Sequence, residues 1–192
     1  MELLQVYPRV LYLDIDVHHG DGVEEAFYLS NRCMTVSFHQ YGEDFFPGTG
    51  GFNEDGEGDG KKYALNIPLK PGISDDAFYE LFRDVMAGVM SKYRPHALVM
   101  QCGADSLCYD KLGQFNLSVR GHGRCLDYML KFGIPTIMMG GGGYTIENVA
   151  RCWAYETGVA LGKDIDNNIP KYDPYYQRYG FDQKIHFPVK VV

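Results

Sequence analysis

The 192-residue sequence has no excess of positive charge, no long apolar run and no signal-peptide pattern at its start. Its formal net charge is -7, from 18 basic and 25 acidic side chains, which argues against a broad electrostatic grip on nucleic acid. Its apolar stretches are all too short to span a bilayer, and the first residues lack the basic and apolar regions of a leader. We therefore expect no membrane partner, no direct nucleic-acid partner, and residence in the cytosol or nucleus.

The five cysteines also lack any Cys-x-x-Cys pairing. All lie in or next to apolar segments, so the prediction is buried, reduced thiols in a reducing compartment, with disulfides as the less favoured alternative. They are Cys33, Cys102, Cys108, Cys125 and Cys152.

The sequence does contain a regular alternation of short apolar runs and helical segments. Strands are predicted over residues 10–16, 33–38, 63–69, 97–102 and 134–139. Helices are predicted over residues 23–29, from the Ser74 cap to about 93, and over 117–132 and 146–161. This order predicts an α/β fold with an open, mainly parallel sheet flanked by helices. Residues 1–163 would form the body of one domain, and residues 164–192 an irregular extension of it.

Polar side chains gather where the first predicted strand ends, in Asp14-Ile15-Asp16-Val17-His18-His19. Side chains two apart on a strand share a face, so Asp14, Asp16 and His18 are expected to point the same way. Acids and imidazoles crowded on one face repel and desolvate each other unless a cation compensates. Carboxylate oxygen and imidazole nitrogen suit zinc or another borderline divalent metal. A solvated acidic strand end with a capping Asp is the simpler alternative, but exposed turns rarely carry His-His beside alternating acids.

Other unusual residues follow other predicted strands: His39, Asp105, and a glycine run at 140–143 that precedes Tyr144. In open α/β sheets, ligands bind outside the carboxyl ends of the strands. We therefore predict that Asp16, His18 and Asp105 hold a metal ion with one open position, as in a catalytic zinc site. For Asp105 alone, a cap on a helix or turn explains the residue equally well.

Tyr144 follows glycines that allow the backbone to fold closely against a substrate. Its hydroxyl could donate a hydrogen bond to the oxyanion of a tetrahedral intermediate. The alternatives are a core tyrosine or a phosphate-binding loop, and the second is weak because no lysine follows at the usual spacing.

Several longer motifs occur in order along the chain. They are Asp-Ile-Asp-Val-His-His-Gly-Asp-Gly (14–22), Phe-Phe-Pro-Gly-Thr-Gly (45–50), Gln-Cys-Gly-Ala-Asp-Ser-Leu (101–107), Phe-Asn-Leu-Ser (115–118) with Gly-His (121–122), Gly-Gly-Gly-Gly-Tyr-Thr (140–145) and Asn-Val-Ala-Arg-Cys-Trp (148–153). From about Glu2 to Tyr179 the sequence resembles a class I zinc-dependent histone deacetylase. The resemblance implies the arginase-deacetylase fold, a nuclear location, and hydrolysis of N-acetyl-lysine amides in transcriptional repression.

The resemblance also implies roles for individual residues. It supports Asp16, His18 and Asp105 as Zn²⁺ ligands and Tyr144 as the transition-state donor. The acetyl-lysine tunnel would be lined by Phe46, Leu112 and the backbone of Gly142 and Gly143. Asp14 and Asp21 match acids that orient a pair of catalytic histidines. Two K⁺ sites are implied, one at Asp14, Asp16, His18, Ser37 and Phe38, and a more peripheral one at Phe27, Ser30, Cys33 and Tyr63.

The sequence departs from the family pattern in two places. The family's general base lies in a Gly-Leu-His-His-type motif upstream of the aspartate strand, and this sequence has no such motif. We therefore expect the chain to be the C-terminal part of a catalytic domain. A general base contributes roughly 10²–10⁴-fold, so the chain alone should be inactive or nearly so. Without the strands of the front half, apolar sheet edge and core would be exposed, so the chain alone should also be unstable or prone to aggregate. Arginines that bind inositol phosphate in relatives are Lys111 and Glu147 here. We therefore do not expect inositol-phosphate activation.

Two other interpretations stay open at this point. The main interpretation, a deacetylase, takes acetylated histone tails or other acetyl-lysine proteins as substrates and corepressor subunits as partners. The first alternative is a non-catalytic relative that binds metal or corepressor subunits. A two-metal hydrolase of the arginase type shares the fold but needs an Asp-x-x-x-Asp set beside Asp105, which the sequence lacks.

Overall fold

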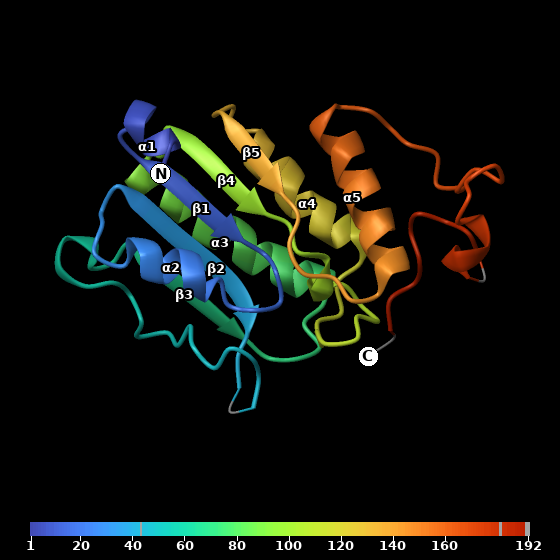
Figure 1. The fold of residues 1–192 in the computed structure, drawn as a ribbon, viewed down its shortest axis with the longest axis horizontal. Coiled ribbons are helices and arrows are strands. Elements are labelled where there is room, and N and C mark those ends of the chain that lie inside the picture. The colour runs from blue at the N-terminus through green and yellow to red at the C-terminus, as the bar shows by residue number, and fades with distance from the viewer. Residues whose placement is uncertain (43, 181, 191–192) are drawn as a thin grey trace.

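The computed structural model describes residues 1–42, 44–180 and 182–190. Five parallel strands form one open sheet in the order β3-β2-β1-β4-β5 (Figure 1). The strands are β1 (Val10–Asp14), β2 (Cys33–Gln40), β3 (Ala64–Leu69), β4 (Ala97–Gln101) and β5 (Thr136–Met139). The helices are α1 (Leu3–Val6), α2 (Asp21–Phe27), α3 (Asp75–Tyr93), α4 (Val119–Leu130) and α5 (Ile146–Ala160), with short 3₁₀ turns at Gly58–Gly60, Ala104–Ser106 and Tyr176–Tyr179. The predicted α/β class and parallel sheet are confirmed.

β1 lies at the centre of the sheet because its residues are apolar on both faces. All five residues of β1 are buried, and Leu11 and Leu13 fully so, as expected for a parallel strand covered on both sides. Asp14 at the end of β1 pairs with Ser37 of β2 and with Gln101 of β4. The segments that follow β1 and β4 therefore leave the sheet side by side, at the same carboxyl edge.

The largest helix, α3, packs behind the sheet and supplies much of the aromatic core (Figure 1). Phe78 and Phe82 are buried on α3, and both rings contact Phe38 of β2, at centroid distances of 5.6 and 5.2 Å. α3 begins after Ser74, at the predicted position, although the Ser74 side chain makes no capping hydrogen bond, and it ends at a left-handed Arg94 with φ of 50°. The core thus fixes β2 and β1 against one rigid helix.

Two predicted strands end earlier than the sequence pattern indicated. β1 ends at Asp14 rather than residue 16, and β4 ends at Gln101 rather than residue 102. In both cases the chain turns after the strand, and the next side chains point toward the candidate metal centre described below. The hydrogen-bonded strand pairing therefore ends before the run of apolar residues does.

β5 was predicted as a buried strand, and this prediction is wrong. Ile137 is 47% exposed and Met139 is 41% exposed, while the alternate residues are half-buried. The reason is topological: β5 is an edge strand of the sheet, next to β4 only. Its exposed side chains lie on a surface that no described residue covers.

The cysteine prediction holds for the described residues, where all five thiols are free and buried. Residues 164–180 and 182–190 are irregular apart from the 3₁₀ turn at Tyr176–Tyr179 and a bridge between Asn168 and Lys184. Among the helices that the structure describes, none combines the length and apolar character that crossing a bilayer requires.

Candidate metal centre

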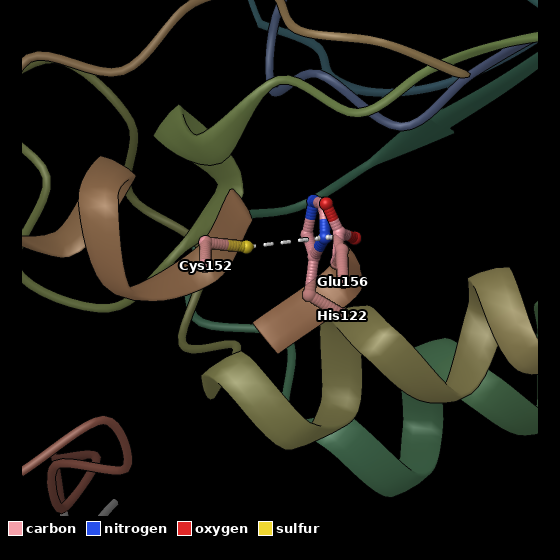
Figure 2. A group of neighbouring side chains, drawn as sticks. All are labelled: His122, Cys152 and Glu156. Atoms are coloured by element: carbon pink, nitrogen blue, oxygen red, sulfur yellow. Dashed lines mark hydrogen bonds and ion pairs between the residues drawn. The ribbon is translucent and has the colours of Figure 1, made fainter. Parts of the chain in front are cut away.

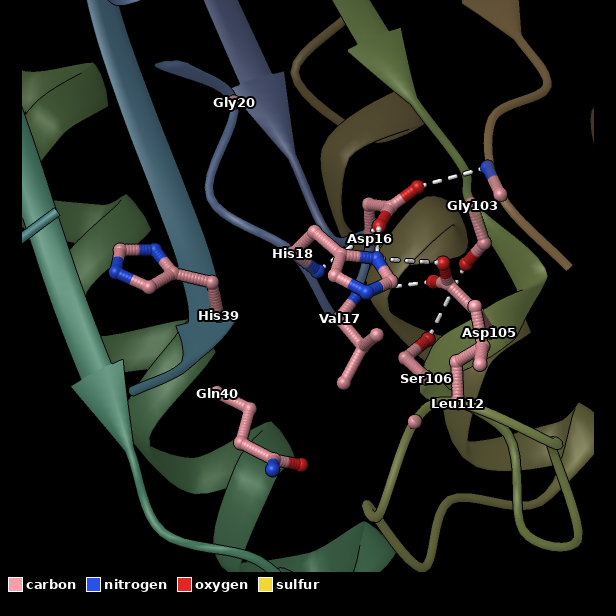
Figure 3. A network of polar contacts seen from close by, with 12 residues as sticks. Asp16, Val17, His18, Gly20, His39, Gln40, Gly103, Asp105, Ser106 and Leu112 are labelled. Atoms are coloured by element: carbon pink, nitrogen blue, oxygen red, sulfur yellow. Dashed lines mark hydrogen bonds and ion pairs between the residues drawn. The ribbon is translucent and has the colours of Figure 1, made fainter. Parts of the chain in front are cut away.

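Asp16, His18 and Asp105 meet at the carboxyl edge of β1 and β4 (Figure 3). Asp16 and His18 lie in the turn after β1, and Asp105 lies in the 3₁₀ turn Ala104–Ser106 after β4. Nδ1 of His18 is 3.1 Å from Oδ1 of Asp16 and 3.0 Å from Oδ2 of Asp105. Parallel pairing of β1 with β4 thus brings together side chains that are 87 residues apart in the sequence.

The donor set fits a zinc ion. One imidazole nitrogen faces two carboxylate oxygens at once, although it can carry only one proton to share between them. Metal–ligand bonds of about 2.0–2.2 Å in a tetrahedral site place ligand atoms roughly 3.3–3.6 Å apart. The observed separations of 3.0 and 3.1 Å need only a small expansion to reach that spacing. Three protein ligands would leave a fourth position for water or substrate.

Neighbouring groups hold the two carboxylates in place. Oδ2 of Asp16 accepts from the amide of Gln101 at 2.9 Å and from the backbone N–H of Gly142 at 2.8 Å. Oδ1 of Asp105 accepts from the backbone N–H of Val17 at 2.9 Å. Both ligands are therefore oriented before any metal arrives, because their remaining oxygens already have partners.

Burial and mutual charge shift the pKa values of all three groups. Hydrogen bonds that His18 donates to Asp105 and then to Asp16 raise the pKa of His18 to about 10. Burial raises the pKa of Asp105 to about 6, with the charge of Asp16 adding to the effect and the hydrogen bond from His18 opposing it. Burial also opposes ionisation of Asp16, but hydrogen bonds from His18 and Gln101 outweigh it and lower its pKa. A metal ion and a proton would therefore compete for His18.

Two glycines allow the backbone to approach these carboxylates. A Cβ added to Gly142 would lie 2.0 Å from Oδ2 of Asp105, and one added to Gly103 would lie 2.1 Å from Oδ2 of Asp16. Real Cβ atoms do not come that close, so any side chain at either position would displace a carboxylate. Gly142 was predicted from the family resemblance as part of a tunnel, and the structure places it directly against the predicted ligands.

Aromatic rings surround the exposed side of His18. Phe45 stacks on the His18 ring at 5.2 Å, while Phe46 and Tyr144 meet it edge-on at 5.9 and 6.2 Å. The sequence reasoning named Phe46 and Tyr144 but missed Phe45, although the Phe-Phe pair was a visible signal. Phe46, Leu112 and Tyr144 are all exposed, and Gly143 follows Gly142 toward Tyr144.

Asp110 joins the loop of Leu112 to the loop of Tyr144. Its Oδ1 accepts from the N–H groups of Leu112 and Gly113 at 2.8 and 3.0 Å. Its Oδ2 accepts from the N–H groups of Tyr144 and Thr145 at 2.8 and 3.3 Å. No sequence pattern predicts this role, because the two loops are distant in the chain.

The predicted orienting acids occupy different environments. Asp14 is buried behind Asp16 and accepts from the Tyr12 hydroxyl at 2.8 Å and from the Asp16 N–H at 3.0 Å. Burial, and then the charge of Asp16, raise the pKa of Asp14 to about 8. Asp21 is exposed at the start of α2 and accepts from the N–H of Gly22.

The second histidine of the pair, His19, points away from the metal centre. Its Nδ1 lies 2.8 Å from Oγ1 of Thr49, and its Nε2 lies 3.1 Å from Oε2 of the buried Glu24. His19 therefore anchors the loop that carries Phe45 and Phe46 to α2. It is not a fourth ligand of the predicted site.

The residues predicted for K⁺ lie on β1 and β2 or in the segments next to them. Ser37 and Phe38 are on β2 beside Asp14, and the Ser37 hydroxyl lies 2.9 Å from Nδ1 of His39. In the predicted peripheral site, the carbonyl of Phe27 accepts from Ser30 and the carbonyl of Tyr63 accepts from Thr35. Cys33 is the first residue of β2.

The two positions considered for inositol phosphate lie on different elements. Lys111 is exposed on the loop before Leu112, and Glu147 is half-buried in the first turn of α5.

Comparison with known proteins matches this amino-acid sequence to one family. The model of the histone deacetylase domain matches residues 1–160. Over 186 residues the chain is 55% identical to histone deacetylase 19 of Arabidopsis thaliana, 56% to histone deacetylase HDAC1 of Drosophila melanogaster and 55% to histone deacetylase 1 of Homo sapiens. The chain belongs to the histone deacetylase family.

The family identification made from the sequence motifs is therefore confirmed. The aligned region covers 97% of this histone deacetylase chain but only 37%, 35% and 38% of those three relatives. The chain thus spans less than two fifths of the length of the curated deacetylases it matches.

Proposed function

We propose that this chain supplies the zinc ligands, the transition-state hydrogen-bond donor and part of the substrate tunnel of a protein lysine deacetylase. The observation that carries the proposal is the convergence of Asp16, His18 and Asp105 on one point beneath an aromatic rim. The family membership supports it, because the matched relatives are named as histone deacetylases.

The three side chains would hold Zn²⁺ through two carboxylate oxygens and Nδ1 of His18. When bound, such an ion lowers the pKa of its water and polarises the amide carbonyl of the substrate. The carboxylates of Asp16 and Asp105 stay fixed by Gln101, Gly142 and Val17, so the protein need not reorganise on binding.

Tyr144 would donate a hydrogen bond to the oxyanion that forms during hydrolysis. Burial, followed by the charges of Asp105 and Asp16, raises the pKa of Tyr144, so its hydroxyl keeps its proton at neutral pH. The carboxylate of Asp110 accepts a hydrogen bond from the backbone N–H of Tyr144 and so fixes the backbone there. This support would keep the hydroxyl directed at the reacting carbonyl.

The acetyl-lysine side chain would pass between Phe46, Leu112 and the backbone of Gly142 and Gly143, with Phe45 behind His18. An apolar channel favours the neutral acetylated stem and disfavours the charged amine of the product. Acetylated histone tails or other acetyl-lysine proteins are the proposed substrates.

The remaining roles follow the same family pattern. Asp14 and Asp21 would orient paired histidines that are not among these 192 residues. K⁺ would occupy the two sites predicted from the sequence. We also propose a nuclear role in transcriptional repression with corepressor subunits. A carboxylate at Glu147 would repel a polyphosphate, and Lys111 lacks the bidentate fork of arginine, so no inositol-phosphate activation is proposed.

Zinc binding and activity can be tested on one preparation. The 192-residue chain should bind about one equivalent of zinc, and Asp105→Ala should abolish that binding. Alone, the chain should leave an acetyl-lysine peptide intact, because it lacks the paired-histidine base. Adding the matching front half of a related deacetylase should restore turnover, and Tyr144→Phe should reduce it by about 10²-fold without changing zinc content.

Full deacetylase activity of the chain alone would refute the proposed division of roles. Zinc binding without activity, even after the front half is added and bound, would favour a non-catalytic, metal-binding relative. A chain that binds no zinc would refute the metal centre itself.

A further inference from the structure

A second group of polar side chains is buried between α4 and α5, next to the metal centre but separate from it. His122 comes from α4, and Cys152 and Glu156 come from α5 (Figure 2). All three are buried, with His122 fully enclosed. Nδ1 of His122 lies 2.6 Å from Oε1 of Glu156 and 3.5 Å from Sγ of Cys152.

The spacing of this cluster does not suit a metal ion. With bonds of about 2.0–2.2 Å, a nitrogen and an oxygen 2.6 Å apart would subtend only about 70–80° at the ion, far from a tetrahedral angle. A distance of 2.6 Å is that of a strong, charge-assisted hydrogen bond. His122 and Glu156 are therefore a directly bonded pair.

The other ring nitrogen of His122 reaches the loop that carries Asp105. Nε2 lies 3.0 Å from the carbonyl oxygen of Gly103, two residues before the predicted ligand. A carbonyl only accepts, so Nε2 must carry a proton in this contact. Glu156 on the opposite nitrogen fixes the plane of the ring, and the ring in turn fixes the Gly103 carbonyl.

Other hydrogen bonds also hold the loop between β4 and Asp105: the N–H of Gly103 donates to Oε1 of Gln101 at 2.6 Å, and the N–H of Cys102 donates to the carbonyl of Met139 at 2.8 Å. Trp153 of α5 donates from Nε1 to the carbonyl of Cys102 at 2.8 Å, and the N–H of Ala104 donates to the carbonyl of Gly142 at 2.8 Å. Ser106 also donates to the Gly103 carbonyl, at 3.2 Å, but it belongs to the loop itself. His122 is thus the contact that ties Gly103 to the helical layer.

We propose that His122 and Glu156 are positioning residues that set the location of Asp105 in the metal centre by holding the Gly103 carbonyl. The proposal rests on the proposed zinc function of Asp16, His18 and Asp105. Neither His122 nor Glu156 would touch the metal or the substrate.

Two substitutions at His122 separate the contact with Gly103 from the contact with Glu156. The amide nitrogen of glutamine reaches about where Nε2 lies, whereas that of asparagine reaches about where Nδ1 lies. His122→Gln should therefore keep the bond to Gly103, and His122→Asn should lose it. Loss of an outer partner of a metal ligand typically weakens metal binding by about 10–100-fold.

The experiment is a zinc titration of the 192-residue chain by competition with a chromophoric chelator, together with Co²⁺ absorption spectra. His122→Asn should raise the zinc Kd by about 10–100-fold and shift the Co²⁺ bands, and Glu156→Gln should act in the same direction. His122→Gln keeps the bond to Gly103 but loses the bond to Glu156, so its zinc Kd should rise clearly less than that of His122→Asn. Met129→Ala, another buried α4 substitution, should lower the stability of the metal-free chain and leave the zinc Kd unchanged.

Equal zinc affinity in the parent and His122→Asn would overturn the positioning proposal while leaving the metal centre intact. Equal losses in His122→Asn, His122→Gln and Met129→Ala would also overturn it, because the effect would then be general destabilisation. A parent chain that binds no zinc would refute the metal centre, and the positioning proposal with it.

Discussion

At the scale of single residues, the proposed metal centre requires a residue without a side chain at position 142, as well as its three ligands. The backbone of Gly142 passes between the two carboxylates, and its N–H donates to Asp16 while Asp105 lies where a Cβ would be. Only glycine can fill that position without moving a ligand.

Gly142→Ala should therefore weaken zinc binding by about 10–100-fold, because the new methyl would displace Oδ2 of Asp105. The measurement is a zinc titration of the purified chain. Gly88→Ala is the matched control, since a Cβ on Gly88 in α3 meets nothing within 4 Å and should leave zinc binding unchanged. A parental Kd for Gly142→Ala would show that the glycine is not required.

His39 gives the fold a defined response to acid. Burial lowers its pKa to about 4 from the ordinary 6.5, with Nε2 facing the Gly50 carbonyl and Nδ1 facing the Ser37 hydroxyl. Above pH 6.5, His39 is neutral in both the folded and the unfolded chain, and its contribution to the free energy of unfolding is at its maximum. As the pH falls from 6.5 to 4, the unfolded chain binds a proton that the folded chain does not, and the free energy of unfolding falls by up to about 3 kcal/mol.

Urea unfolding of the parent and of His39→Gln at several pH values between 7 and 4 measures this contribution. Glutamine can still donate to the Gly50 carbonyl but does not titrate. The parent should lose more unfolding free energy than the variant over this range. Identical pH profiles for the two would contradict the assignment to His39.

At the scale of secondary-structure elements, β5 is the most exposed part of the sheet. It has β4 on one side, and Ile137 and Met139 are exposed. An apolar edge strand with free backbone groups pairs readily with other chains. The sequence pattern could not show this, because β5 reads as a buried strand and its edge position is set by strand order.

Ile137→Lys should reduce self-association of the chain, because a charged side chain on an edge strand opposes strand pairing. Light scattering and size-exclusion chromatography at increasing concentration would measure it. Leu161→Lys is the control, since Leu161 is also exposed but lies at the end of α5. Equal effects of both substitutions would point to general solubility rather than to the strand edge.

The three metal ligands could be predicted from the order of strands and helices in the sequence, whereas the residues that hold the site in place could not. Strand ends gave Asp16, His18 and Asp105 because parallel strands deliver their carboxyl ends to one edge. Phe45, Asp110 and the His122–Glu156 pair were not predicted, since each acts through contacts between segments far apart in the sequence. The family resemblance named Tyr144 and Phe46, but the structure was needed to show Asp110 beneath the Tyr144 loop.

At the scale of the whole molecule, folding and metal binding should be coupled. The ligands meet only when β1 and β4 are paired, so zinc should bind the folded state far better than the unfolded chain. Zinc at about 100 times its Kd should raise the unfolding free energy by about 2.7 kcal/mol. Denaturant unfolding with and without zinc tests this, and Asp105→Ala should show no increase.

The single tryptophan gives this molecule an optical reporter at a useful place. Trp153 is half-buried, its indole N–H donates to the carbonyl of Cys102, and its ring packs against Gly140 at the start of the glycine run. Both segments that flank the metal centre therefore touch the same fluorophore. Its emission wavelength and quenching should report the local order of those segments without any added label, and distinguish their loosening from unfolding of the sheet.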